Sequence, residues 1–222
     1  MAERRPETRR SAGEWALRGG LAAIVAVAGY IGTTFALALS QASTNPIFAH
    51  RLAPYDGQLS GKAAFATATE DIVDGAVRPA GIALARHALL QDANAVAAVV
   101  TLGIDAEMRG DVAAARRFFD YAQKLTRRDQ RTQSWLIEDY SLRRQDIVGA
   151  LHQYDIALRA IPRLAETLYP VLGAASADAG IRKELVKTLA QRPVWATNFI
   201  EFVSNSNEVD ATTAASLIAA LR

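Results

Sequence analysis

The sequence predicts an all-helical protein in which one membrane-spanning helix precedes a soluble helical domain. Three observations support this fold class. Alanine, a strong helix former with little preference for strands, fills 45 of the 222 positions. Residues 20–39 form an apolar stretch that is long enough to cross a bilayer. Residues 99–163 contain two similar segments with the spacing of paired helices.

Residues 1–18 form a basic tail that carries five arginines and three glutamates. The rest of the chain holds 20 basic and 20 acidic side chains, so the net charge of +2 lies in this tail. A domain that binds nucleic acid normally presents a basic surface to the phosphates. We therefore expect no nucleic acid among the partners of this protein.

Residues 19–40 are predicted to form a transmembrane anchor. No ionisable side chain other than Tyr30 occurs between Gly19 and Ala49, and about 20 apolar residues in a helix cross a hydrocarbon core of about 30 Å. Five arginines precede this segment, and no lysine or arginine follows it before Arg51. The positive-inside rule thus predicts a cytoplasmic tail and a body on the outer side of the membrane.

The composition also indicates which membrane this is. Arginine outnumbers lysine 21 to 4 and alanine is in excess, as in proteins encoded by GC-rich bacterial genomes. We expect a single-pass protein of a bacterial inner membrane, with the C-terminal domain in the periplasm and the N-terminal helix in contact with the lipid bilayer. The alternative is a secretory signal cleaved after Ala42, which would leave a soluble periplasmic protein, although the apolar run is longer than in most signals.

Residues 41–62 contain two prolines, two glycines and several turn-forming residues, without a helical or strand period. This composition predicts an irregular linker that separates the membrane from the folded domain. The folded domain is then expected to begin near residue 63.

Two segments of the soluble part, 99–128 and 133–163, repeat the same pattern. The matched pairs are Leu102 with Leu136 and Ala106 with Tyr140 at an offset of 34, then Asp111 with Asp146, Ala115 with Ala150, Phe119 with Tyr154 and Ala122 with Ala157 at an offset of 35. The single extra residue falls where a turn is expected, since Gly110 and Asp111 are residue types of a helix C-cap and N-cap. Each segment is therefore predicted to be two helices joined by a short turn.

The order Leu102, Gly103, Ala115, Phe119 and Ala122 resembles the tetratricopeptide repeat, whose period is 34 residues. The second segment supplies matching residues at Leu136, Tyr140, Ala150, Tyr154, Ala157 and Pro162, and departs from the family pattern at Ile137, which replaces a glycine. An earlier stretch, 79–95, is similar to the second helix of a preceding unit. The resemblance implies a short α-solenoid of helical repeats over 63–163.

Residues 164–222 do not continue the repeat but have the composition of further helices. Pro193 and residues 205–207 separate these helices, and Asp178 and Asp210 are typical N-cap residues. The expected helices are 164–175, 181–191, 194–204 and 210–221. Because the last unit of a solenoid must cover an exposed core edge, we expect these helices to form a cap.

The residue types of common catalytic and metal sites are scarce. The absence of cysteine excludes disulfides, thiol nucleophiles and zinc–thiolate or iron–sulfur sites. No two of His50, His87 and His152 have the spacing of metal ligands, and no glycine-rich phosphate loop is present. The adjacent carboxylates Glu138 and Asp139 diverge by about 100° on a helix. We expect no enzyme activity, no cofactor and no metal.

The resemblance implies that partners bind on the inner face of the solenoid, which the first helix of each unit lines. Carried over by position, the candidate partner-binding residues are Ile104, Glu107, Met108, Arg131, Ser134 and Glu138. Some members of the family hold a peptide carboxylate with lysine and asparagine on this face. None of the six positions has either residue, so no carboxylate clamp is expected.

These expectations describe a membrane-anchored scaffold or adaptor that binds other proteins or peptides of the cell envelope. The resemblance suggests export or polysaccharide assembly as its setting. Two alternatives stay open at this point: an accessory subunit that contacts a larger membrane complex through its anchor, and a small periplasmic enzyme.

Overall fold

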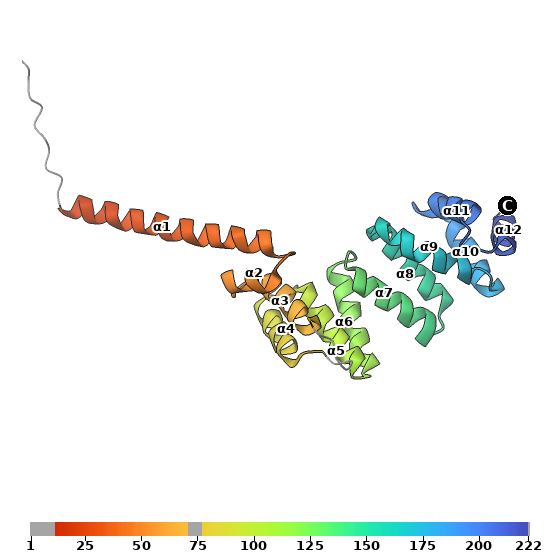
Figure 1. Ribbon diagram of the computed structural model, residues 1–222, viewed down its shortest axis with the longest axis horizontal. Helices are drawn as coiled ribbons and strands as arrows, with labels where there is room; N and C mark the ends of the chain where they lie inside the picture. The colour runs from red at the N-terminus through yellow and green to blue at the C-terminus, as the bar shows by residue number, and fades with distance from the viewer. Residues whose placement is uncertain (1–11, 71–76, 222) are drawn as a thin grey trace, which may run out of the picture.

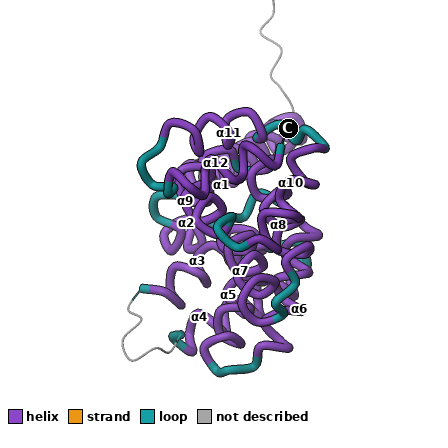
Figure 2. Tube along the Cα trace, turned by 90° about the vertical axis from the view of Figure 1, so that its right-hand side faces the viewer, coloured by secondary structure: helices purple, strands orange, loops and turns teal. Residues whose placement is uncertain are grey.

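The computed structural model describes residues 12–70 and 77–221, and the regular elements within these ranges are helices (Figures 1 and 2). The predicted all-α fold with one long apolar N-terminal helix is confirmed. The α-helices are α1 (Ala12–Gln41), α2 (Pro46–Leu52), α3 (Gly57–Thr69), α4 (Pro79–Gln91), α5 (Val96–Met108), α6 (Val112–Leu125), α7 (Gln130–Glu138), α8 (Ile147–Ala160), α9 (Ala165–Ala175), α10 (Ala179–Ala190), α11 (Ala196–Asn205) and α12 (Ala211–Ala220). A π-helical turn, Asp139–Arg143, follows α7, and a 3-10 turn, Pro162–Leu164, precedes α9.

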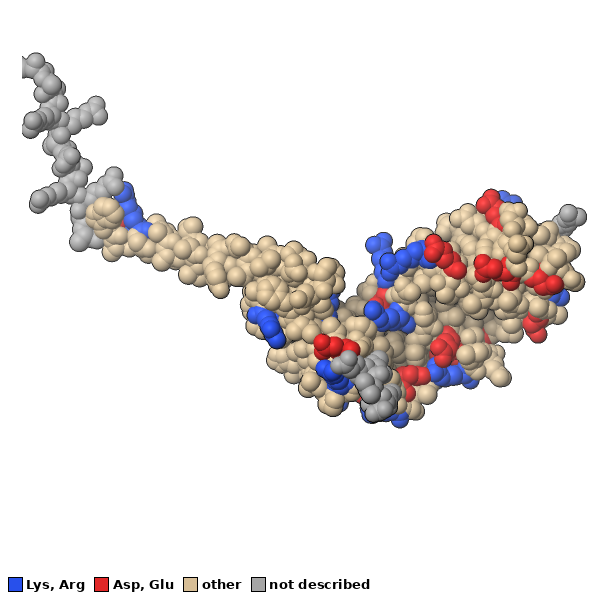
Figure 3. Space-filling model, in the orientation of Figure 1, with Lys and Arg blue, Asp and Glu red and all other residues tan. Residues whose placement is uncertain are grey.

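Helix α1 has the length and composition of a membrane span over Gly13–Gln41. It projects away from the other helices (Figure 1), and the visible face of its apolar part carries no charged side chain (Figure 3). The Thr33 hydroxyl donates a hydrogen bond to the carbonyl oxygen of Gly29 at 2.8 Å, and Thr34 is paired within the helix in the same way, as lipid requires. A helix of this kind near the N-terminus is compatible with a membrane anchor or with a signal sequence.

The expected irregular linker over 41–62 is wrong, because α2 and the first half of α3 occupy these residues. Asn45 caps α2 and Asp56 caps α3, each through a side-chain oxygen that accepts a hydrogen bond from a backbone N–H. Pro46 is the first residue of α2, a position where the missing N–H of proline costs nothing. The turn-forming residues of this stretch therefore start helices instead of interrupting them.

Gly57 and Gly61 lie where α3 packs closely on its neighbours. A Cβ atom at Gly57 would lie 2.5 Å from the Cβ of Asp92, and one at Gly61 would lie 3.2 Å from the backbone nitrogen of Ala98. Both positions are buried. These glycines allow close helix contacts and do not mark a flexible segment.

The end of α1 packs directly on the soluble domain. A hydrophobic cluster joins α1, α2 and α3, and its buried members are Ala38, Ala42, Ala49, Ala53 and Leu59, with Phe35 and Leu52 packed against them. Ala38, Ala49 and Ala53 have no exposed surface at all. The last turns of α1 thus belong to the core of the domain.

Successive helices pack into three hairpins, α3–α4, α5–α6 and α7–α8, which follow one another along the long axis of the molecule (Figure 1). Helix α4 (Pro79–Gln91) covers most of the stretch 79–95, for which a second helix of a preceding unit was predicted. Between α5 and α6, Gly110 takes a φ of +77° and the Asp111 side chain accepts a hydrogen bond from the backbone N–H of Ala114 at 2.9 Å. Both caps are those that the sequence predicted.

The extra residue of the second repeat lies in the π-helical turn Asp139–Arg143. There the backbone N–H of Arg144 donates to the carbonyl oxygen of Asp139, five residues back, at 2.9 Å. Gln145 follows with a φ of +53°, which ends the turn before α8. The insertion expected in the loop is therefore taken up at the end of the first helix of this hairpin, as a wider helical turn.

The side chains between the hairpins have the predicted register. Phe119 is 1% exposed and stacks on Trp135 with the ring centroids 4.5 Å apart. Ala115 and Ala122 on either side of it have no exposed surface, whereas the neighbouring Phe118 is only half-buried. The apolar face of α6 is thus the one that the spacing of three and four residues indicated.

Helices α9–α12 follow the third hairpin and correspond closely to the four predicted C-terminal helices. Asp178 and Asp210 cap α10 and α12 through backbone N–H hydrogen bonds. Trp195 and Phe199 are buried in a cluster that also contains Tyr154 of the third hairpin. The C-terminal helices therefore share one core with the end of the repeat region.

Candidate functional site

A groove of about 400 Å³ is formed by the first helices of the three hairpins together with the turn after α1. Its lining residues are Ala42, Ser43 and Pro46 near the anchor, Gln58, Lys62, Phe65 and Ala66 on α3, Val96, Ala97 and Val100 on α5, and Thr126, Arg128, Asp129 and Arg131 around the start of α7. A volume of this size is in the range of sites that bind small ligands or a few side chains of a peptide. The groove lies directly beside the end of α1.

The groove has an apolar floor and a cationic rim. Phe65, Val96 and Val100 provide the floor, while Lys62 and Arg128 are exposed at the rim. Among the residues that the structure describes, neither of these two cations has an ion-pair partner. An occupant with apolar and acidic groups would therefore match the lining.

The third cation of the rim is held in place. The Arg131 guanidinium lies 4.1 Å above the centre of the Phe65 ring, a cation–π contact that joins α7 to α3. The carboxylate of Asp129 lies 4.0 Å from Arg131, but it also caps α7 by accepting a hydrogen bond from the backbone N–H of Thr132 at 2.8 Å. The one acidic side chain of the lining is thus engaged in the helix cap.

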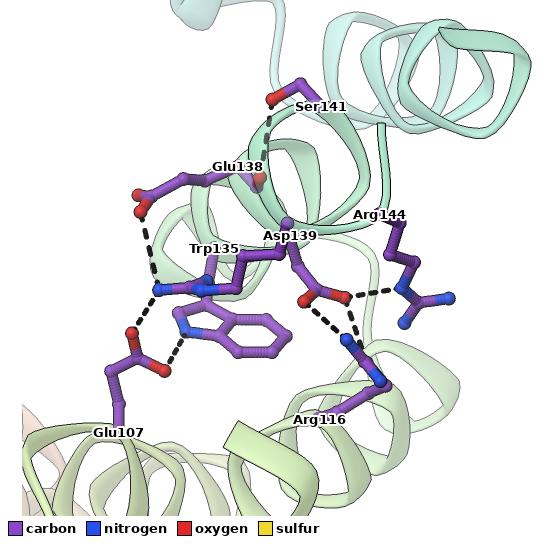
Figure 4. Close-up of polar contacts among 8 residues, drawn as sticks. Glu107, Arg116, Trp135, Glu138, Asp139, Ser141 and Arg144 are labelled. Carbon is purple, nitrogen blue, oxygen red and sulfur yellow. Dashed lines mark hydrogen bonds and ion pairs between the residues drawn. The ribbon is translucent and has the colours of Figure 1, made fainter. Parts of the chain in front are cut away.

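A second polar arrangement lies where the α5–α6 hairpin meets α7 (Figure 4). Glu107 accepts a hydrogen bond from the indole N–H of Trp135 at 3.1 Å and another from Arg143. Arg143 also lies 3.5 Å from the carboxylate of Glu138. The two glutamates are therefore bridged by one arginine and are partly neutralised within the molecule.

Asp139 is the buried centre of this arrangement (Figure 4). Arg116 of α6 donates two hydrogen bonds to its carboxylate at 2.8 and 3.0 Å, and Arg144 donates one at 2.7 Å. Burial works to raise the pKa of Asp139, but the hydrogen bonds and charges of the two arginines outweigh it and hold the pKa below its ordinary value. The Asp139 carboxylate thus ties the third hairpin to the second.

The six residues predicted to bind a partner do not form one site. Only Arg131 lines the groove. Ser134 lies with Arg131 in a separate polar hollow of about 450 Å³, Glu107 and Glu138 belong to the Arg143 bridge, and Ile104 is half-buried against the Phe119 cluster. Met108 is 38% exposed at the end of α5.

Sequence reasoning missed the α3 side of the groove, because Lys62 was assigned to the linker over 41–62 and Phe65, at the start of the repeat region 63–163, was assigned to no helix. A signal was present: Gly57, Gly61, Ala64 and Ala68 are spaced by four, three and four residues, as on one face of a helix. All four of these small residues are buried. The small-residue face packs inward and leaves Lys62 and Phe65 toward the groove.

No group of three or more histidine, aspartate and glutamate side chains is placed to hold a metal ion within residues 12–70 and 77–221. His50 lies beside a hydroxyl, with its Nδ1 3.1 Å from the Oγ of Ser60. Burial, and secondly the charge of His87, lower the pKa of His50. His87 is 3.1 Å from the side-chain nitrogen of Gln91.

The comparisons with known proteins give no relative. No protein-family model, no curated protein and no solved structure matches this chain. The likeness to tetratricopeptide repeats therefore stays a prediction based on residue spacing, and the function has to be inferred from the geometry of the groove and the anchor.

Proposed function

We propose that the protein is a membrane-anchored scaffold or adaptor of the bacterial cell envelope, which binds an acidic and apolar segment of another envelope protein in the groove. The single observation that carries the proposal is the apolar floor with Lys62 and Arg128 exposed at its rim and without an ion-pair partner among the described residues. The tetratricopeptide resemblance adds to it, because this groove is on the face lined by first helices.

A retained anchor is favoured over a cleaved signal by the packing at the end of α1. Cleavage after Ala42 would remove Phe35, Ala38 and Ala42 from the hydrophobic cluster. The apolar surface of Leu59, which is now 1% exposed, would then be left open to water. The five arginines before Gly19 orient the anchor with its N-terminus in the cytoplasm, so that the groove would face the periplasm.

The proposed occupant follows from charge complementarity. Lys62 and Arg128 are solvated cations at the edge of an apolar surface, and carboxylates of a peptide could pair with both while its apolar side chains cover Val96 and Phe65. A small polar metabolite would leave most of the apolar floor uncovered. A peptide segment of a membrane or periplasmic protein fits better.

The proposal can be tested by site-specific photo-crosslinking of the full-length protein in its native membrane. A photoreactive side chain in place of Ser43, which is exposed at the groove, should give one discrete protein adduct. Mass spectrometry should place the cross-link in a segment that contains several aspartates or glutamates. The same group in place of Leu142, which is 69% exposed away from the groove, should not give this adduct.

Charge reversal provides the decisive comparison. Like charges at an interface can cost several kcal/mol, so Lys62→Glu with Arg128→Glu should reduce the adduct at least about tenfold. The matched variant Arg117→Glu with Lys124→Glu makes the same change of net charge on exposed residues of α6 and should retain it. Equal loss in both variants would refute the groove. Adducts obtained only from a group placed at Ile31 of α1 would favour an accessory subunit that binds through its anchor.

A further inference from the structure

Helix α2 lies beside the last turns of α1 and reaches further toward the start of α1 than any other helix of the soluble domain (Figure 1). Ala49 and Ala53 fix it there, since they are buried against Ala38 of α1. The position of α2 relative to the membrane helix is therefore set by core packing.

The level of α2 along the membrane normal follows from the length of α1. Its 30 residues measure about 45 Å, which exceeds a hydrocarbon core of about 30 Å. If the hydrocarbon core begins directly after Arg18, a helix of about 20 residues crosses it, and its outer boundary lies close to Ala38. Ala38 is the residue against which α2 packs, so α2 is placed at the boundary between acyl chains and headgroups.

The outward face of α2 and of the following turn has the chemistry of that boundary. Phe48 is 40% exposed and Tyr55 is 61% exposed, and Arg51 is exposed between them. Tyrosine, whose ring has a polar edge, is enriched at membrane interfaces, and phenylalanine is typical of the apolar face of interfacial helices. Arginine places its guanidinium at the phosphates while its aliphatic stem stays in the apolar layer.

We infer that residues 46–55 form an interfacial segment that inserts Phe48 and Tyr55 into the outer leaflet and places Arg51 against lipid phosphates. The partner is the lipid surface itself, because the segment is packed on the membrane helix at the depth where that surface lies. The inference rests on the proposed membrane anchoring of α1. It adds that the soluble domain is held on the bilayer in one orientation by two elements.

The chain has no cysteine. A single introduced cysteine can therefore be labelled with a nitroxide spin label, and no natural cysteine has to be removed first. Full-length variants Phe48→Cys, Arg51→Cys and Tyr55→Cys would be reconstituted into vesicles of zwitterionic and anionic phospholipid. At each position, the rate at which the spin label collides with oxygen, which concentrates in lipid, is compared with the rate at which it collides with a water-soluble nickel chelate. Ile24→Cys on α1 is the lipid control, and Leu142→Cys and Val194→Cys, at residues 69% and 78% exposed, are the water controls.

The ratio of oxygen to nickel collisions should be raised at positions 48 and 55 relative to 142 and 194, with 51 intermediate and 24 highest. Ratios at 48 and 55 equal to the water controls would overturn the inference. Low collision rates with both reagents would also overturn it, because they would mean that protein covers the segment. A label at 24 that reports water would overturn the anchor itself. If Phe48→Cys fails to fold, the exposed positions 51 and 55 decide the outcome.

Discussion

The half of the domain next to α1 and the half distant from it are built from side chains of different size. The buried residues of the first half are mostly alanine, including Ala38, Ala42, Ala49, Ala53, Ala64, Ala85, Ala88, Ala95 and Ala98. The distant half buries Tyr154, Tyr169, Trp195 and Phe199 among several leucines. Close contact of helix backbones holds the first half together, whereas rings and leucines fill wider spaces in the second.

This difference means that the two halves are sensitive to opposite changes. Where helix backbones touch, the buried side chains are already small, so a truncation removes little volume. A substitution that adds a methyl group there has no space for it. Where a ring fills a wide space, its removal leaves a cavity whose cost grows with its volume. Asp139 lies between the two halves, where it accepts hydrogen bonds from Arg116 and Arg144. Its substitution therefore tests how strongly the halves are coupled.

The largest effect is expected for Phe199→Ala in the distant half. Phe199 has no exposed surface and makes edge-to-face contacts with Tyr169 and Trp195 at centroid distances of 5.3 and 5.9 Å. Its truncation should lower the free energy of unfolding by about 3–5 kcal/mol. Urea unfolding of the full-length protein in mild detergent, followed by circular dichroism, measures this loss. Phe202→Ala, at a half-buried ring, should lose less; an equal loss would argue against a cavity mechanism.

A smaller loss is expected for Gly81→Ala in the half next to α1. A Cβ atom at Gly81 would lie 2.5 Å from both the Cβ and the backbone nitrogen of Ala68, so α3 and α4 would have to separate. Overpacking of this kind costs about 1–3 kcal/mol, although alanine is the better helix former. The control is Gly180→Ala, where the nearest atom is a carboxylate oxygen of Asp178 at 3.1 Å. A loss at Gly180 that matched the one at Gly81 would show that close packing is not the cause.

An effect of the same size as that of Gly81→Ala, and the only one that depends on pH, is expected for Asp139→Asn. Loss of charge-assisted hydrogen bonds from Arg116 and Arg144 should cost about 1–3 kcal/mol at neutral pH. Because the pKa of Asp139 is lowered in the folded protein, its contribution is complete above the ordinary value of about 3.9 and is lost as the pH falls through the lowered pKa.

Urea unfolding between pH 7 and pH 3 checks this sign. The difference in unfolding free energy between the natural protein and Asp139→Asn should shrink below about pH 4. Glu138→Gln, at the exposed carboxylate next to it, serves as the control and should change little at any pH. A difference that grew as the pH fell would mean that the carboxylate is protonated in the folded state.

Local signals were sufficient to predict most helices of the distant half. Gly110, Asp111, Asp178 and Asp210 act as the caps that their residue types indicate. Next to α1 the same reasoning failed at residues 41–62, because proline, asparagine and aspartate serve equally in loops and at helix starts. Only contact with α1, α4 and α5 decides between the two, and such contacts are distant in sequence.

The groove was predictable only in part for the same reason. Arg131 was identified from its repeat position, but Lys62 and Arg128 come from segments 66 residues apart that meet only in the fold. Glu107 and Glu138 were placed correctly on first helices, yet their engagement with Arg143 follows from the π-helical turn. A period of 34 residues does not predict where an inserted residue is accommodated.

The groove wall formed by Ala42, Ser43 and Pro46 has a kinetic consequence. With α1 retained as the anchor that we propose, the groove would meet its ligand by lateral diffusion in the bilayer when that ligand is itself part of a membrane protein. Confinement to a thin layer raises the effective concentration of such a ligand far above that of a freely dissolved one. Weak contacts in the groove would then be sufficient for occupancy, and dissociation could stay fast enough for repeated exchange of partners.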